Sequence, residues 1–244
     1  MSIELKQRIE NYWNNRASDF KNQSIAEMKN ERYDDWLEII NKYIPKQKKL
    51  RVLDIGTGAG YMAMLLASQG HIVTGVDLCA NMISAAKEAS SLLDLQCDFM
   101  QQDAEKLSFP EEYFDVIITR NLTWTLINVS EDYKLWFSFL KQNGVLINFD
   151  ADYGQSTFGA RLKPSATPQP TLPPKNNLHG NLSSETLAEC NAIKSVLEIS
   201  QHRRPGWDVN ILRECGFKNI YLEFNLHKNV PFRQGGMFGI FAYK

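Results

Sequence analysis

The sequence predicts an α/β fold with a mostly parallel sheet. From about residue 50 onward, short apolar segments of strand length alternate with segments whose apolar residues recur at helical spacing. The segment 114–119 is a nearly continuous apolar run, as a strand buried on both faces requires. The last two apolar segments are joined by a short linker with proline and glycine, which predicts an antiparallel hairpin. Because strands that alternate with helices form right-handed βαβ units, the other strands should be parallel.

The elements are expected in a regular order. The predicted strands lie at 50–55, 71–77, 95–101, 114–119, 145–149, 218–225 and 237–243. The predicted helices after the first strand lie at 60–69, 80–92, 131–141, 183–199 and 207–216. Two earlier helical patterns fall within residues 1–45, and the polar stretch 14–30 between them is expected to be a mobile connection.

Composition and charge limit the possible functions. The 244 residues carry a formal net charge of −1, which gives no electrostatic reason to expect binding to nucleic acid or to an anionic membrane. The N-terminus lacks the apolar core of a signal peptide, and no apolar stretch is long enough to cross a bilayer. The four cysteines form no CxxC pair and no metal-ligand spacing with the histidines. We therefore expect free thiols, no bound metal and a cytoplasmic location.

The segment 50–60 is the most informative part of the chain. It is an apolar strand that ends in a glycine-rich turn, with Asp54 two positions before Gly56, and with Thr57, Gly58 and Gly60 completing the turn. Glycines let the backbone approach a ligand without a Cβ in the way. The helix behind the turn directs its free N–H groups and positive dipole end toward the same place. This arrangement predicts a ligand-binding turn.

A second acidic residue indicates which ligand the turn binds. Asp77 ends the next apolar run, 21 positions after Gly56, where a carboxylate can accept both hydroxyls of a ribose. A dinucleotide site favours the pattern GxGxxG, whereas here the glycines run GxGxG and Tyr61 stands in place of the third. A ligand without a diphosphate does not need the third glycine, so its binding is not weakened by Tyr61. The spacing therefore favours S-adenosylmethionine over a dinucleotide.

Successive motifs of this chain resemble those of a known family. The segment 52–60, Asp77, the pair Asp103 and Ala104, and the segment 114–121 look like the motifs of class I S-adenosylmethionine-dependent methyltransferases, in the small-molecule, methyltransferase type 11-like branch. The resemblance implies a Rossmann-like sheet of seven strands with an antiparallel last strand and helices on both faces. It covers residues 50–150 well, and the final hairpin also fits.

The resemblance also implies where each part of the cofactor would lie. The turn would face the methionine part, Asp77 the ribose, and Asn121 the methionine or the methyl acceptor. Tyr12 would belong to a helix that folds over the cofactor, although core packing is an alternative role for it. The full set of expected cofactor-binding residues is Tyr12, Asp54, Gly56, Thr57, Gly58, Gly60, Asp77, Leu78, Met82, Asp103, Ala104 and Asn121.

These motifs divide the chain into four expected parts. They are an N-terminal helical cap at 1–45, a cofactor-binding core at 46–150, a lid-like insert over the acceptor site at 151–206, and a C-terminal helix and hairpin at 207–244 that complete the core. The insert is expected because five of the nine prolines fall between Pro164 and Pro174, where they exclude helix and interior strand. A loop of this length in a compact domain is usually functional or disordered.

The predicted function is methyl transfer from S-adenosylmethionine to a small-molecule acceptor by in-line displacement. The attacking atom, oxygen, nitrogen or carbon, and the oligomeric state stay open. An RNA or protein acceptor, a catalytically silent cofactor-binding protein and a nicotinamide oxidoreductase are the alternatives. No catalytic residue is identified. Candidates to take a proton from the acceptor are Asp150, Asp152, Tyr153, His179 and His202.

Overall fold

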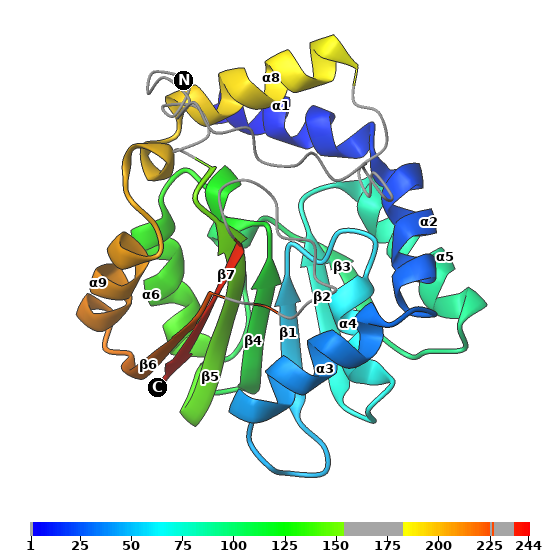
Figure 1. Ribbon diagram of the computed structural model, residues 1–244, viewed down its shortest axis with the longest axis vertical. Coiled ribbons are helices and arrows are strands. Elements are labelled where there is room, and N and C mark those ends of the chain that lie inside the picture. Colours follow the sequence, from blue (N-terminus) through cyan, green and yellow to red (C-terminus); the bar gives the residue numbers. More distant parts are fainter. Residues whose placement is uncertain (1, 154–182, 225, 227–236) are drawn as a thin grey trace, which may run out of the picture.

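A computed structural model describes residues 2–153, 183–224, 226 and 237–244. Its centre is a seven-stranded sheet in the order β3-β2-β1-β4-β5-β7-β6 (Figure 1). The strands are β1 (Arg51–Ile55), β2 (Ile72–Asp77), β3 (Asp98–Gln101), β4 (Phe114–Arg120), β5 (Leu140–Ala151), β6 (Lys218–Glu223) and β7 (Met237–Tyr243). β1 to β5 pair in parallel, and β7 runs antiparallel to β5 and β6. The predicted sheet and its antiparallel last strand are therefore confirmed.

Helices cover both faces of this sheet. The α-helices are α1 (Ser2–Asn14), α2 (Ala17–Glu27), α3 (Arg32–Tyr43), α4 (Tyr61–Ala67), α5 (Ala80–Leu92), α6 (Val129–Phe139), α8 (Ser184–Val196) and α9 (Gly206–Glu214). Short 3₁₀ turns are η1 (Ala104–Lys106), η2 (Thr123–Thr125) and η4 (Glu198–Gln201). Among the described residues, no helix is both long and apolar enough to span a membrane.

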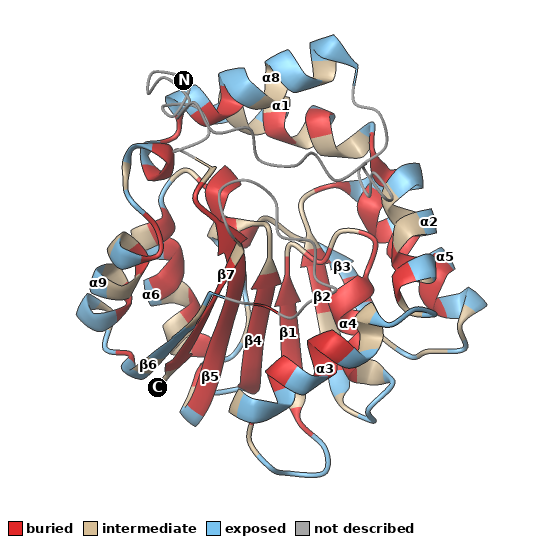
Figure 2. Cartoon of the chain, viewed as in Figure 1, coloured by how far each residue is buried: buried red, intermediate tan, exposed pale blue. Residues whose placement is uncertain are grey.

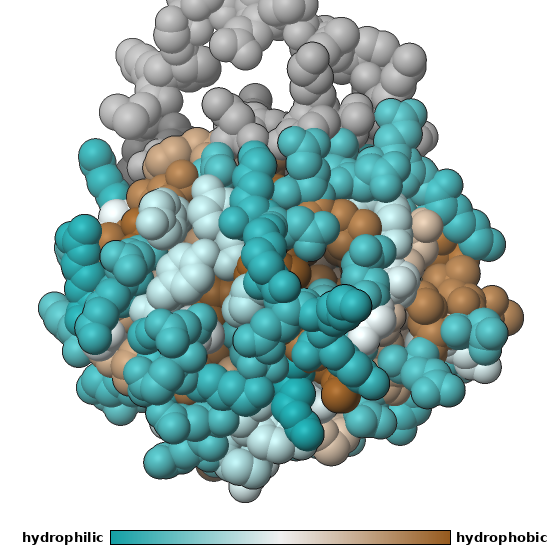
Figure 3. All heavy atoms as spheres, turned by 90° about the horizontal axis from the view of Figure 1, so that it is seen from below, coloured by the Kyte–Doolittle hydropathy of each residue, from teal (hydrophilic) through white to brown (hydrophobic). Residues whose placement is uncertain are grey.

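The pleat of the central strands divides the core into two layers. Leu53 of β1 and Ile117 of β4 pack with α6 and α9, whereas Val52 and Ile118 pack with α3, α4 and α5. Because successive side chains of a strand point to opposite faces, a run of apolar residues fills both layers at once. The central strands are accordingly buried along most of their length (Figure 2). By contrast, the surface that is seen when the molecule is viewed from below is largely hydrophilic (Figure 3).

The strand order creates a crevice between β1 and β4. The connection after β1 leads to β2 on one side, and the connection after β4 leads to β5 on the other. Where neighbouring parallel strands send their connections in opposite directions, the loops at their carboxyl ends separate and leave room for a ligand. The glycine-rich turn follows β1 and residues 121–126 follow β4, so both border this crevice.

The structure corrects the prediction for residues 14–30. The expected mobile connection contains an 11-residue helix, α2. Its buried positions are Ala17, Ser24 and Glu27, so the covered face carries small and polar side chains and shows no apolar periodicity. The helix expected at 183–199 also ends earlier, as α8, and continues as η4. The centre of the predicted lid, 154–182, lies outside the described residues.

Candidate functional site

The three glycines of the turn all have left-handed backbone angles, but their surroundings differ. Gly58 has φ +54°, and a Cβ placed there would meet nothing within 4 Å, so its main chain faces open space. Gly60 has φ +83°, and a Cβ there would lie 2.9 Å from Cζ of Phe99. Gly58 thus exposes backbone to a ligand, while Gly60 permits close packing of α4 against β3.

Asp54 stabilises the turn from within. Its Oδ2 accepts hydrogen bonds from Oγ1 of Thr57 at 2.6 Å and from the backbone N–H of Ala63 at 3.0 Å. The residue is 1% exposed. Burial raises the pKa of its carboxyl to about 6, although these two hydrogen bonds oppose the shift. The carboxyl group therefore holds the turn against α4 as well as lining the site.

Asp77 directs its carboxylate at the same turn. Its Oδ2 accepts from the N–H of Gly58 and its Oδ1 from the N–H of Cys79, both at 2.9 Å. Burial raises the pKa of Asp77, and the two backbone donors oppose this. A carboxylate has about four acceptor positions, so each oxygen can still accept a bond from a ligand hydroxyl.

A lysine from α1 contacts the acidic side chains at η1. Asp103 caps this turn, with Oδ1 accepting from the N–H of Glu105 at 3.1 Å, and its Oδ2 accepts from Nζ of Lys6 at 2.6 Å. Lys6 also pairs with Glu105. Burial lowers the pKa of Lys6, but the bonds to the two carboxylates outweigh this and raise it. Both oxygens of Asp103 are therefore engaged, and a ligand amine would share them.

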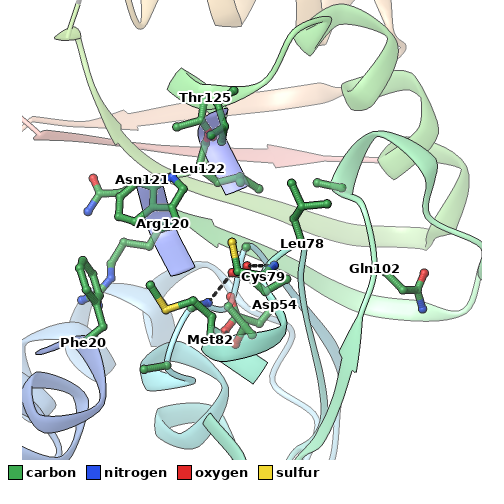
Figure 4. Close-up of a pocket in the computed structure, with 18 of the residues that line it drawn as sticks. Phe20, Asp54, Leu78, Cys79, Met82, Gln102, Arg120, Asn121, Leu122 and Thr125 are labelled. Atoms are coloured by element: carbon green, nitrogen blue, oxygen red, sulfur yellow. Dashed lines mark hydrogen bonds between the residues drawn. The ribbon is translucent and has the colours of Figure 1, made fainter. Parts of the chain in front are cut away.

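These groups line one pocket of about 1060 Å³, measured with its solvent-open mouth. In the view of Figure 4, Phe20 and Gln102 lie at opposite ends, with Leu78, Cys79 and Met82 between them. Other lining residues are Lys6, Ile9, Trp13, Ser24, Asp54, Gly56, Thr57, Gly58, Ala59, Tyr61, Met62, Asp77, Asp103, Ala104, Glu105, Arg120, Asn121, Leu122, Thr125 and Leu126. The segments at the carboxyl ends of β1 to β4 and the helices α1 and α2 thus share one cavity.

Arg120 connects the end of β4 to α2. Its Nη1 lies 3.2 Å from Oε2 of Glu27, and its guanidinium lies over the ring of Tyr61 at 4.6 Å. Glu27 is 3% exposed and also pairs with Arg32 at 3.2 Å. Although burial favours the neutral acid, Arg120 holds the pKa of Glu27 below its usual value. This ion pair fixes α2, with Phe20 and Ser24, over the pocket.

Asn121 stands where β4 ends. It has φ +57°, its N–H donates to the carbonyl of Phe149, and its Oδ1 accepts from the hydroxyl of Tyr153 at 3.0 Å. The ring of Tyr153 packs against Trp124, with ring centroids 5.0 Å apart. Asn121 is thus held from both sides while its side chain borders the cavity.

Comparison with known proteins identifies the domain. Residues 53–148 match the family described as a methyltransferase domain. A solved S-adenosylmethionine-dependent methyltransferase from Mesorhizobium loti superposes with a TM-score of 0.61 at 18% identity, covering 86% of this chain and 98% of that one. Residues 53–148 therefore form a methyltransferase domain, and the fold is that of solved S-adenosylmethionine-dependent methyltransferases.

Sequence relatives match part of the chain. A putative methyltransferase of Geobacillus is 31% identical over 121 residues, which are 47% of this chain and 49% of that protein. A ubiquinone biosynthesis O-methyltransferase of Coxiella burnetii is 38% identical over 93 residues, which are 35% of this chain and 40% of that protein. The chain therefore aligns with about half or less of the length of these relatives.

Most of the expected cofactor residues of the methyltransferase domain meet at its pocket. Two of the twelve, Tyr12 and Gly60, are not among the lining residues. The ring of Tyr12 is 7% exposed and packs in the core, edge-on to Trp13, which does line the pocket. Burial raises the pKa of Tyr12 to about 12. Tyr12 thus packs in the core, and its place over the cofactor stays a prediction.

The structure separates the candidate proton acceptors. Asp150 is fully buried, and its carboxylate bonds to Arg204 and Thr123. His202 stacks on Trp207, and neither residue lines the pocket. His179 lies outside the described residues. Tyr153 contacts a pocket residue directly, because its hydroxyl donates to Asn121. In the described part of the chain, no group of three His, Cys, Asp or Glu side chains is arranged to hold a metal ion.

Several lining residues were not found from the sequence. Lys6, Phe20, Ser24, Glu105 and Arg120 reach the pocket from α1, α2, η1 and the end of β4. Their contacts join residues far apart in the chain, such as Lys6 with Asp103, and no local pattern marks them. Arg120 gave the one available signal, because it is a charged residue at the end of an apolar strand and the carboxyl ends of parallel strands border ligand sites.

Proposed function

We propose that this chain transfers the methyl group of S-adenosylmethionine to a small-molecule acceptor. The observation that carries the proposal is Asp77, whose carboxylate lies in the pocket beside the open backbone of Gly58. This pairing of an acceptor for ribose hydroxyls with bare main chain suits a nucleoside. When bound, the cofactor supplies an activated methyl group on a sulfonium.

The charges of the pocket fit such a cofactor. The lining includes four carboxylate side chains, Asp54, Asp77, Asp103 and Glu105, and two basic side chains, Lys6 and Arg120. Both basic groups are already paired with carboxylates. An excess of negative charge attracts a cationic sulfonium and disfavours the diphosphate of a nicotinamide dinucleotide. The charges therefore support the methyl donor over a dinucleotide.

The residues of the chain would act mainly by positioning. Asn121 and Phe20 would orient the acceptor at the end of the pocket away from Gln102, and α1 with Trp13 would exclude water. The hydroxyl of Tyr153 contacts Asn121 directly, and we propose Tyr153 as the group that takes a proton from the methyl acceptor. The residues proposed to bind the cofactor are those predicted from the sequence that line the pocket, with Lys6 added.

The acceptor and the setting are also proposals. We propose an acceptor small enough to be enclosed under α1, α8 and the insert 151–206, because α8 is tied to α1 by the ion pair between Arg8 and Glu189 at 2.8 Å. We propose a cytoplasmic location because all four cysteines are free. The relatives favour an oxygen or a nitrogen as the attacking atom, since one is a ubiquinone biosynthesis O-methyltransferase and a structural neighbour is a phosphoethanolamine N-methyltransferase.

The test is a search for methylated product. The purified chain would be incubated with methyl-labelled S-adenosylmethionine and fractionated extract, and small molecules that gain about 14 Da, one methylene, would be sought by mass spectrometry. We expect labelled small molecules that disappear when sinefungin is added. Label in RNA or protein alone would contradict the small-molecule acceptor. Tight cofactor binding with no labelled product would favour a catalytically silent protein.

A further inference from the structure

A buried polar cluster lies behind one wall of the pocket. Its centre is Arg204, whose side chain is 2% exposed, between the carboxylates of Asp150 and Asp208, which are fully buried. Arg204 Nη1 donates to Oδ2 of Asp150 at 3.0 Å, and its Nε and Nη2 donate to the two oxygens of Asp208 at 2.9 and 2.7 Å. None of the three is among the pocket-lining residues. The cluster joins the end of β5 to the start of α9.

One hydroxyl connects this cluster to η2. Oγ1 of Thr123 donates to Asp150, and it accepts from Nη2 of Arg204 at 2.6 Å and from Nδ2 of Asn148 at 3.2 Å. The backbone N–H of Trp124 adds a bond to Oδ2 of Asp150 at 3.1 Å. A hydroxyl has one donor and two acceptor positions, so Thr123 uses all three.

The turn that the cluster holds forms a wall of the pocket. Leu122 directly precedes η2, and its Cδ1 would be 2.7 Å from a Cβ placed on Gly56 of the glycine-rich turn. Thr125 ends η2 and also lines the pocket (Figure 4). Trp124 packs edge-on to Trp13 of α1, with ring centroids 6.1 Å apart. A shift of η2 would therefore change the packing against the glycine-rich turn and against α1.

Such a cluster is better suited to fixing geometry than to adding stability. The desolvation of buried ions cancels much of their attraction, and apolar residues of the same volume are often as stable. Fully satisfied hydrogen bonds, by contrast, specify one arrangement. We propose that Arg204 and Asp150 are positioning residues that set the cofactor pocket by holding η2 through the hydroxyl of Thr123. This rests on the proposed function, because the ligand concerned is the methyl donor.

The test is the affinity for S-adenosylhomocysteine, measured by calorimetry on the full chain. Thr123→Val removes the hydroxyl at nearly constant volume and should weaken binding at least tenfold. Thr123→Ser keeps the hydroxyl and should stay within threefold of the wild type. The matched control is Thr119→Val on β4, where an equally buried hydroxyl has no hydrogen-bond partner among the described residues. It should stay within twofold.

Each outcome decides the proposal. Thr123→Val with wild-type affinity, or Thr119→Val with an equal loss, would overturn it. If Thr123→Val does not fold, Tyr133→Phe decides, because the Tyr133 hydroxyl donates to Asp208 at 2.8 Å and accepts at 2.9 Å from Nδ2 of Asn148, which also donates to Thr123. That variant should weaken binding at least threefold, and unchanged affinity would refute the positioning role. A wild type that does not bind the ligand would instead refute the proposed function.

Discussion

Gly58 and Gly60 share a left-handed backbone but should respond differently to a methyl group. In Gly60→Ala the new Cβ meets Phe99, and both strain and overpacking should lower the free energy of unfolding by about 1–3 kcal/mol. In Gly58→Ala the methyl enters open space, so the cost should be about 1 kcal/mol, from the backbone alone. S-adenosylhomocysteine binding should be lost mainly in Gly58→Ala. Denaturant unfolding and calorimetry of both variants measure this, and equal binding losses would contradict it.

Asp77 should be the side chain on which cofactor affinity depends most. Asp77→Ala removes the acceptor for ribose hydroxyls, and hydrogen bonds to a charged group are worth about 1.5–3 kcal/mol, so affinity should fall about 10- to 100-fold. The control is Asp98→Ala, an exposed acid at the start of the neighbouring strand β3. Calorimetry with S-adenosylhomocysteine measures both. An unchanged affinity of Asp77→Ala would remove this residue from the ribose role.

Asp132 should make stability depend on pH. It is 3% exposed, its Oδ2 has no hydrogen-bond partner among the described residues, and burial, with Glu105 nearby, raises its pKa from 3.8 to about 8. The folded state therefore holds a proton that the unfolded state has released between about pH 4 and pH 8. Its contribution to stability falls as pH rises through this window, by about 1.4 kcal/mol for each unit by which the pKa is raised.

The comparison of Asp132→Asn with the wild type isolates this effect. Below pH 4 the two should differ little, and by pH 8 the variant should be the more stable by chemical denaturation. Asp34→Asn, at an exposed position of α3, is the control and should not change the pH profile. A difference between wild type and Asp132→Asn that stays constant from pH 4 to pH 8 would show that Asp132 does not titrate in this range.

At the scale of elements, strands could be predicted and α2 could not. The central strands are apolar runs because both of their faces are buried, and that property is local in the sequence. Helix α2 covers the site with Ser24 and Glu27 on its buried face, and Glu27 is held by Arg120, which lies 93 positions away. The glycine-rich turn and Asp77 could likewise be predicted, because their spacing is a local property of the sequence. The places of Lys6 and of the cluster around Arg204 depend on contacts between residues far apart in the chain, so they could not be predicted.

Helix α1 should control how fast the cofactor leaves. Lys6 ties it to Asp103 and Glu105 at the pocket edge. Partly exposed ion pairs contribute about 0.2–1 kcal/mol each, so Lys6→Met should speed dissociation of S-adenosylhomocysteine a few-fold, as high salt should do in the wild type. The control is Lys21→Met, which removes the ion pair between Lys21 of α2 and Glu88 of α5. Stopped-flow measurements in which both variants release the ligand equally fast would contradict this role for Lys6.

At the scale of the whole molecule, the carboxyl edge of the sheet concentrates acidic groups although the chain is nearly neutral. The net charge is −1 over 244 residues, yet four carboxylates line one pocket, where their two basic neighbours are already paired. A site arranged in this way favours a cationic nucleoside over an anionic dinucleotide through long-range as well as local interactions. The whole fold, with its switch between β1 and β4, places these groups at one crevice.

The proposed function depends most directly on which adenosine ligand this pocket accepts. Calorimetric titration of the wild-type chain with S-adenosylmethionine, S-adenosylhomocysteine and NADH, under one set of conditions, measures this choice. We predict saturable binding of the first two at one site per chain and no detectable binding of NADH. Binding of NADH without any response to S-adenosylhomocysteine would contradict the account.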